Sequence, residues 1–233
     1  GRFDANSNNR NKHGIAEHEI PEYVNVLRSV LVYLDDAVIM NLHDCNYYSK
    51  NYQFNRMLLR IKYDVPQLDE QYLCERTTLC IIYKENVIYL LNKMRVNILF
   101  MNYVDGRLEI DASVPDHFSR EKVAYYFRLN GVRYDVVFNE GYSLTKYFGV
   151  SAYKRFSFHA SIPLKTTGEH QELQFFVQYE NKEYVVLTEY KSHTSRLSND
   201  PASSYWHFGT FLARRNPYTI MIDPYNWTAM VQV

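Results

Sequence analysis

The sequence predicts an α+β protein in which an N-terminal helical segment precedes an antiparallel, immunoglobulin-like β-sandwich. Apolar residues recur at helical spacing up to about residue 95 and alternate with polar residues after it. The alternating runs are short and separated by turn signals, of which Asn130-Gly131 is the strongest. The chain also contains 22 Tyr and 13 Phe, and aromatic side chains pack well on the pleated surface of a sheet.

Three helices are expected after a polar loop over residues 1–19. The first begins at Ile20-Pro21, because proline suits the first turn of a helix, and its apolar positions continue to Leu34. Asp35-Asp36 marks its solvent-exposed end. The second helix covers about 48–61, and the third covers about 75–94. The third is predicted from a wide apolar stripe at helical spacing, formed by Leu79, Ile82, Tyr83, Val87, Leu90, Leu91 and Met94.

Seven short strands are expected next, and their connections leave no room for the helices of parallel βαβ units. They cover about 96–102, 107–113, 122–129, 132–138, 156–162, 173–179 and 184–190. Asp105-Gly106 and Asn130-Gly131 are expected to close hairpins. The sequence thus predicts a helical segment over 1–95, a sandwich over 96–191 and a tail over 192–233. The tail adds edge strands at 219–223 and 227–233 or links the sandwich to a following domain.

Composition limits the classes of function. Lys+Arg and Asp+Glu number 26 each, and a net charge of zero argues against a nucleic-acid-binding protein. No run approaches the roughly 18 apolar residues of a membrane-spanning helix, and the polar N-terminus does not resemble a signal peptide. An odd number of cysteines without a C-x-x-C pair favours reduced thiols in the cytoplasm.

Catalytic and metal motifs are weak. The sequence has no nucleophile elbow, no P-loop and no dinucleotide-binding glycine pattern. His43, Cys45, Cys74 and Cys80 could supply zinc ligands, but their spacing is wider than that of tetrahedral zinc sites, so buried thiols are the favoured interpretation. Asp35-Asp36 could hold Mg²⁺ or act as a carboxylate pair, although nothing else in the sequence converges on it.

One face of the predicted sheet carries the candidate binding residues. Tyr126 and Arg128 share a face of their strand, and Gln174 and Phe176 share a face of theirs. We therefore predict that Tyr126 and Phe176 point outward together. Three interpretations remain open for such a surface: stacking on a sugar ring, contact with another domain or a second copy, and ordinary packing within the chain.

Two parts of the sequence resemble a known enzyme family. The segments 20–23, 33–39 and 60–63 (IPEY, YLDDAVI and RIKY) resemble the helical C-terminal end of bacterial family 2 glycosyltransferases of the GT-A fold. The segments 156–164 and 195–199, with Ser204-Tyr205-Trp206, resemble the accessory β-sandwich of the members that build capsule and teichoic-acid polymers. The resemblance extends over roughly residues 14 to 210.

The resemblance implies a parent enzyme that transfers a sugar from a nucleotide donor, with Mg²⁺ or Mn²⁺, to a growing surface polymer at the inner membrane face. The family's first strand with its proline and its acidic D-x-D metal motif have no match here, because Glu109-Ile110-Asp111 falls in a predicted strand. No catalytic residue and no cofactor is therefore carried over. The one transfer is a basic loop before Gly14, whose Arg10, Lys12 and His13 are expected to contact the donor diphosphate.

The expected function is that of a non-catalytic part of such a glycosyltransferase, in which the sandwich positions domains, oligomerises or holds the acceptor polysaccharide. The chain begins without Met, so we expect a fragment that is inactive by itself and whose partners are the remaining domains of the parent enzyme. The alternative is a stand-alone carbohydrate-binding or adaptor module. A metal-dependent enzyme that uses His43 and the cysteines is the weakest of the three hypotheses.

Overall fold

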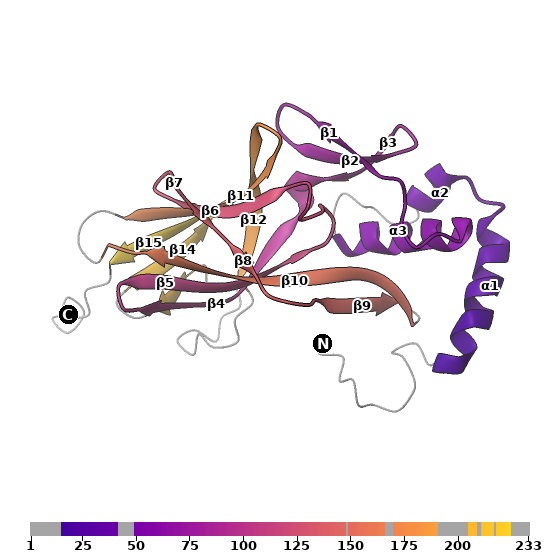
Figure 1. The fold of residues 1–233 in the computed structure, drawn as a ribbon, viewed down its shortest axis with the longest axis horizontal. Helices are drawn as coiled ribbons and strands as arrows, with labels where there is room; N and C mark the ends of the chain where they lie inside the picture. Colours follow the sequence, from indigo (N-terminus) through magenta and orange to yellow (C-terminus); the bar gives the residue numbers. More distant parts are fainter. Residues whose placement is uncertain are drawn as a thin grey trace. The chain divides into compact units, whose positions relative to one another are not determined.

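The computed structural model describes residues 15–41, 49–147, 149–165, 170–190, 205–208, 211–216 and 218–224 (Figure 1). In this part of the chain strands predominate, and the few helices include one near the N-terminus, which is compatible with the predicted α+β class. Contacts divide the chain into two compact units, each described here by itself. Unit 1 comprises Gly1–Leu73, Cys80–Leu90 and Leu144–Lys154, and unit 2 comprises Cys74–Leu79, Leu91–Ser143 and Arg155–Val233.

The helices of unit 1 are α1 (Ile20–Leu31), α2 (Asp36–Asn41) and α3 (Ser49–Tyr63), preceded by a 3-10 turn at Glu17–Glu19. The helices predicted from Ile20 and over 48–61 are therefore confirmed. Asp36 begins α2 rather than marking an exposed helix end. The apolar sides of the three helices supply a buried core, which contains Leu31, Ile39, Met57, Leu58, Leu59 and Ile61.

The helix predicted over 75–94 is wrong. The structure instead has a sheet of β1 (Gln71–Cys74), β2 (Leu79–Tyr83) and β3 (Asn86–Leu90), followed by a 3-10 turn at Leu91–Lys93. Four of the five β2 side chains are buried, so the strand lacks the alternation of a half-buried strand. The sequence also carries no signal for the two-residue turn between β2 and β3. Lys84 and Glu85 adopt φ values of 47° and 66°, whereas turns of this kind usually contain Asn-Gly.

Unit 2 is built on one extended sheet. Its strands are β4 (Arg95–Val104), β5 (Arg107–Pro115), β6 (Ala124–Leu129), β7 (Val132–Asp135), β8 (Val137–Phe138), β11 (Gln171–Tyr179), β12 (Lys182–Tyr190), β13 (Tyr205–Phe208), β14 (Phe211–Asn216) and β15 (Thr219–Pro224). The strands β9 (Ser143–Tyr147) and β10 (Val150–Pro163) extend into both units.

The predicted hairpins and most predicted strands are confirmed. Asp105-Gly106 joins β4 to β5 and Asn130-Gly131 joins β6 to β7, each with both residues at positive φ. The strand predicted over 132–138 is divided into β7 and β8, and the strand predicted over 219–223 is β15. The edge strand predicted over 227–233 lies outside the described residues.

Strand β11 organises the sheet of unit 2 (Figure 1). It pairs with β6 along residues Leu173–Gln178, and it also pairs with β12 and β15. The strands β12 and β4 are parallel, with Leu187 opposite Arg95, whereas the sequence predicted antiparallel pairing throughout. This pair needs no local crossover helix, because the long chain segment between the two strands serves as the connection.

The core of unit 2 is aromatic. Phe127 of β6, Phe158 of β10 and Phe175 of β11 are fully buried. The ring centroids of Phe127 and Phe175 lie 4.9 Å apart, and those of Phe158 and Phe175 lie 5.4 Å apart. Since β10 and β11 are not hydrogen-bonded neighbours, these ring contacts connect strands that are separated in the order of the sheet.

Candidate functional site

The four residues predicted on the sheet face stand next to one another. In the pairing of β11 with β6, Gln174 lies opposite Arg128, and Phe176 lies opposite Tyr126. Strands β7 and β12 extend the same surface on either side. We call this surface the aromatic face and define it by Tyr126, Arg128, Arg133, Gln174, Phe176, Gln178 and Glu183.

The two rings of the aromatic face are stacked. The ring centroids of Tyr126 and Phe176 are 5.6 Å apart, and their planes differ by only 6°. The Arg133 guanidinium lies 4.0 Å from the Tyr126 centroid, and that of Arg128 lies 4.9 Å from the Phe176 centroid. The arginines thus cover the rings, and such cation–π contacts stabilise both partners.

The expectation that both rings are exposed is wrong for Tyr126. The two side chains do share a face, but Tyr126 is completely buried, whereas Phe176 is half-buried. The Arg133 guanidinium lies against the Tyr126 ring, the Phe176 ring stacks on it, and Glu183 binds its hydroxyl, so these neighbours cover the tyrosine. A ligand on this surface would therefore meet Phe176, the arginines and the neighbouring amides rather than the Tyr126 ring.

Glu183 of β12 orders the polar groups of the aromatic face. Its carboxylate accepts a hydrogen bond from the Tyr126 hydroxyl at 2.5 Å and two from one Arg128 nitrogen at 2.7 and 2.8 Å. The Tyr126 hydrogen bond and the arginine charges hold the pKa of Glu183 below its usual range. Burial raises the pKa of Tyr126, and the Glu183 carboxylate raises it further, so the phenol stays protonated at neutral pH.

Sequence reasoning missed Arg133 and Glu183, whereas strand alternation places Gln178 on the face of Gln174 and Phe176. Arg133 lies opposite Arg128 across the Asn130-Gly131 hairpin, and it donates to Gln178 at 2.8 Å. The hairpin register alone would have placed Arg133 beside Arg128. Glu183 can be placed on this face only from the pairing of β11 with β12, in which it lies opposite Gln178.

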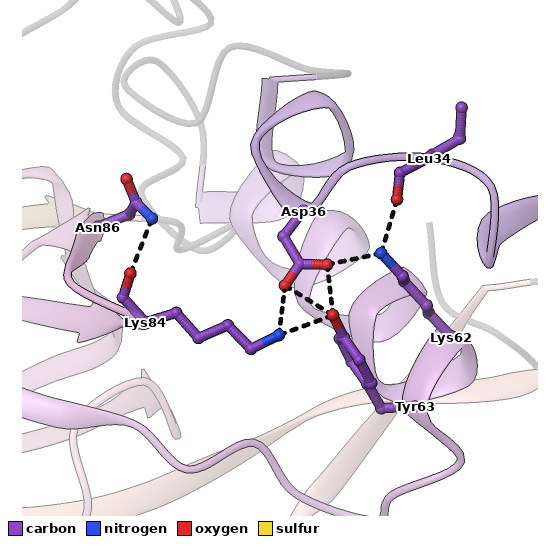
Figure 2. A network of polar contacts seen from close by, with 6 residues as sticks. All are labelled: Leu34, Asp36, Lys62, Tyr63, Lys84 and Asn86. Carbon is purple, nitrogen blue, oxygen red and sulfur yellow. Dashed lines mark hydrogen bonds and ion pairs between the residues drawn. The ribbon is translucent and has the colours of Figure 1, made fainter.

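A second cluster lies in unit 1 and joins α2, α3 and the β2–β3 turn (Figure 2). Asp36 accepts hydrogen bonds from Lys62 Nζ, Lys84 Nζ and the Tyr63 hydroxyl, each at 2.8 Å. Lys84 Nζ also donates to the Tyr63 hydroxyl at 2.7 Å. Burial raises the pKa of Asp36, but the hydrogen bonds from Lys62, Lys84 and Tyr63 outweigh it, so the pKa is lowered and the carboxylate stays charged.

A third cluster lies on β5 and β10. The ring of His159 bridges two carboxylates, with Nδ1 2.9 Å from Asp111 and Nε2 2.7 Å from Glu109. Ser161 also donates to Glu109, and Arg107 donates to Ser161. The hydrogen bond with Asp111 raises the pKa of His159 most, burial opposes it, and the hydrogen bond with Glu109 adds to the rise, so the pKa is raised overall.

This cluster predicts a pH dependence of stability. Because the pKa of His159 is raised in the folded state, its stabilisation is complete below the unfolded value of about 6.5 and is lost as pH rises through the folded value. We expect the free energy of unfolding to fall as pH rises above about 6.5, and we expect His159→Gln to flatten that part of the profile. Urea denaturation across this range is the measurement, and an identical slope in the variant would refute the assignment.

Other predicted site residues remain apart or undescribed. Arg10, Lys12, His13, His43 and Cys45 lie outside the described residues. Cys80 is buried in β2 and Cys74 is half-buried, and neither forms a disulfide within the part of the chain described. Among those same residues, no group of three or more His, Cys, Asp or Glu side chains is arranged to hold a metal ion. No described helix is long and apolar enough to cross a membrane.

Comparisons with known proteins give little guidance. No family model matches the chain, and no curated protein matches it. Fifteen chains of solved structures match, among them the N-terminal domain of PorA, which is 14% identical. That match covers 45% of this chain and 91% of the PorA chain, with a TM-score of 0.21. A likeness this weak assigns neither a fold nor a function.

Proposed function

We propose that the chain is a non-catalytic module of a bacterial glycosyltransferase that builds a surface polysaccharide, either a capsule or a teichoic acid. In this proposal unit 2 is the accessory, immunoglobulin-like sandwich, and its aromatic face holds the acceptor polymer. The observation that carries the proposal is the in-register group of Tyr126, Arg128, Gln174 and Phe176 on neighbouring strands.

The chemistry of the aromatic face suits a sugar. A pyranose ring presents apolar C–H groups to an aromatic surface and hydroxyls, which both donate and accept hydrogen bonds, around its edge. The half-buried Phe176 offers the apolar contact. The arginines donate hydrogen bonds, and the Gln174 and Gln178 amides can donate and accept. The arginine forks also suit a phosphate or carboxylate group on the polymer.

The remaining parts of the proposal concern the parent enzyme. The other domains would supply the catalytic residues, the divalent Mg²⁺ or Mn²⁺ and the nucleotide-sugar site, and Arg10, Lys12 and His13 would contact the donor diphosphate. The parent would work in the cytoplasm at the inner membrane face, with association into oligomers as a further role of the sandwich. The resemblance of the sequence to family 2 glycosyltransferases supports this part.

The affinity of the aromatic face for oligosaccharides tests the proposal. We expect Phe176→Ala to weaken binding of capsule or teichoic-acid oligosaccharides by about three- to tenfold, because one ring contact contributes about 0.5–1.5 kcal/mol. Arg128→Ala should weaken it similarly through the lost guanidinium donors. Isothermal titration calorimetry measures both variants.

The matched control is Phe100→Ala, which removes a 40% exposed ring on β4, outside the aromatic face. We expect it to bind as the native chain does. Equal affinity of native protein and Phe176→Ala, or equal losses in Phe176→Ala and Phe100→Ala, would contradict a role of this face.

A further inference from the structure

A cleft of about 660 Å³ opens in unit 1 beside the Asp36 cluster. It is lined by the end of α3, the loop that follows, the first residue of β1 and the end of β2 with its turn. The lining residues are Tyr63, Val65, Gln67, Leu68, Asp69, Gln71, Ile82, Tyr83, Lys84 and Glu85. Its volume is in the range of small-molecule sites, which are roughly 300–1,000 Å³.

The lining combines an apolar floor with a polar rim of both hydrogen-bonding types. Of the residues that line the cleft, Leu68 and Tyr83 are buried, and Tyr63 is 39% exposed. The exposed rim residues are Gln67, Asp69, Gln71, Lys84 and Glu85. The lysine donates hydrogen bonds, the carboxylates accept them, and the amides do both. Because the rim carries both positive and negative side chains, it lacks the single sign of charge that would select an ionic ligand.

The β2–β3 turn is held in a costly conformation that places two of these rim residues. Lys84 and Glu85 both have positive φ, which non-glycine residues adopt at an energetic cost. Lys84 Nζ donates to Asp36 and to the Tyr63 hydroxyl, and it lies 4.2 Å from the Tyr63 ring centroid (Figure 2). These contacts fix the lysine at the cleft and use two of its three N–H groups. Strain maintained in this way is typical of binding sites.

We propose that this cleft is a saccharide site that takes one neutral sugar ring. The apolar floor and the Tyr63 ring pack against the C–H face of the sugar. The rim amides, the carboxylates of Asp69 and Glu85, and the third N–H of Lys84 bind its hydroxyls. This site uses none of the aromatic-face residues, so it goes beyond the function proposed above and succeeds or fails separately.

Nuclear magnetic resonance of the full chain tests the cleft. The probes are the methyl glycosides of glucose, galactose, mannose, rhamnose and N-acetylglucosamine, added one at a time. We expect at least one to give saturable amide shifts at residues 67–71 and 82–85. We further expect Gln71→Ala and Glu85→Ala each to weaken that binding by about three- to tenfold, since each removes a hydrogen-bonding group from the rim.

Two controls separate the cleft from other effects. Val87→Ala truncates a 53% exposed side chain of β3 that does not line the cleft, and it should leave the affinity unchanged. Phe176→Ala should also leave the shifts at 67–71 and 82–85 intact. The proposal is overturned if none of the probes shifts these amides at the highest concentration tested. It is also overturned if the shifts persist with native affinity in both rim variants.

Discussion

Replacing Phe175 by Ala is expected to lower the free energy of unfolding of unit 2 by about 3–5 kcal/mol. The ring is fully buried, and it contacts Phe127, Phe158 and Tyr125 at centroid distances of 4.9, 5.4 and 6.1 Å. Its removal loses the transfer free energy of a large apolar group and leaves a cavity beside the aromatic side chains of β6 and β10. Urea denaturation followed by circular dichroism measures the loss.

Phe100→Ala is again the matched control, because the same truncation at a 40% exposed position should cost under about 1 kcal/mol. A loss of similar size in both variants would mean that Phe175 does not occupy the centre of the unit 2 core.

The second large effect is expected at the ion pair between Arg56 of α3 and Glu70. Arg56 Nη2 lies 2.6 Å from Glu70 Oε2, and the two side chains are only 11% and 7% exposed. Glu70→Ala removes the carboxylate from a mostly buried guanidinium, and breaking such a pair typically costs about 3–5 kcal/mol. The stability of unit 1, measured by urea denaturation, should fall accordingly.

The double variant Arg56→Met with Glu70→Leu distinguishes charge burial from lost packing. Replacement of a buried ion pair by apolar side chains of similar size is often neutral or stabilising. We therefore expect the double variant to recover most of the stability that Glu70→Ala loses. A double variant as unstable as the single one would show that the charges themselves are needed for this unit to fold.

The sequence predicted best where turn chemistry and periodicity agree. Asp105-Gly106 and Asn130-Gly131 supply residues that tolerate positive φ between alternating runs, so both hairpins were predictable. The region 75–94 failed for the opposite reason. Strand β2 is buried along almost its whole length and so lacks alternation. The β2–β3 turn uses Lys84-Glu85, which is not a turn signal in sequence and is held by contacts with distant residues such as Asp36.

The candidate site was predictable in part. Strand alternation was enough to place Tyr126 with Arg128 and Gln174 with Phe176, and the pairing of β6 with β11 brings the two sets into register. The burial of Tyr126 was not predictable, since it depends on side chains of neighbouring strands that lie against its ring and bind its hydroxyl. Asp36 likewise gains its partners from α3 and from the β2–β3 turn, which are distant in sequence.

The most direct test of the central proposal maps where oligosaccharides bind on the unmodified chain. Backbone amide resonances would be followed while oligosaccharides from bacterial capsules and teichoic acids are added. The proposal predicts saturable shifts on β6, β7, β11 and β12, centred on Arg128 and Phe176. The proposal would be contradicted if none of the oligosaccharides shifted the amide resonances of these four strands, even at the highest concentration that stays in solution.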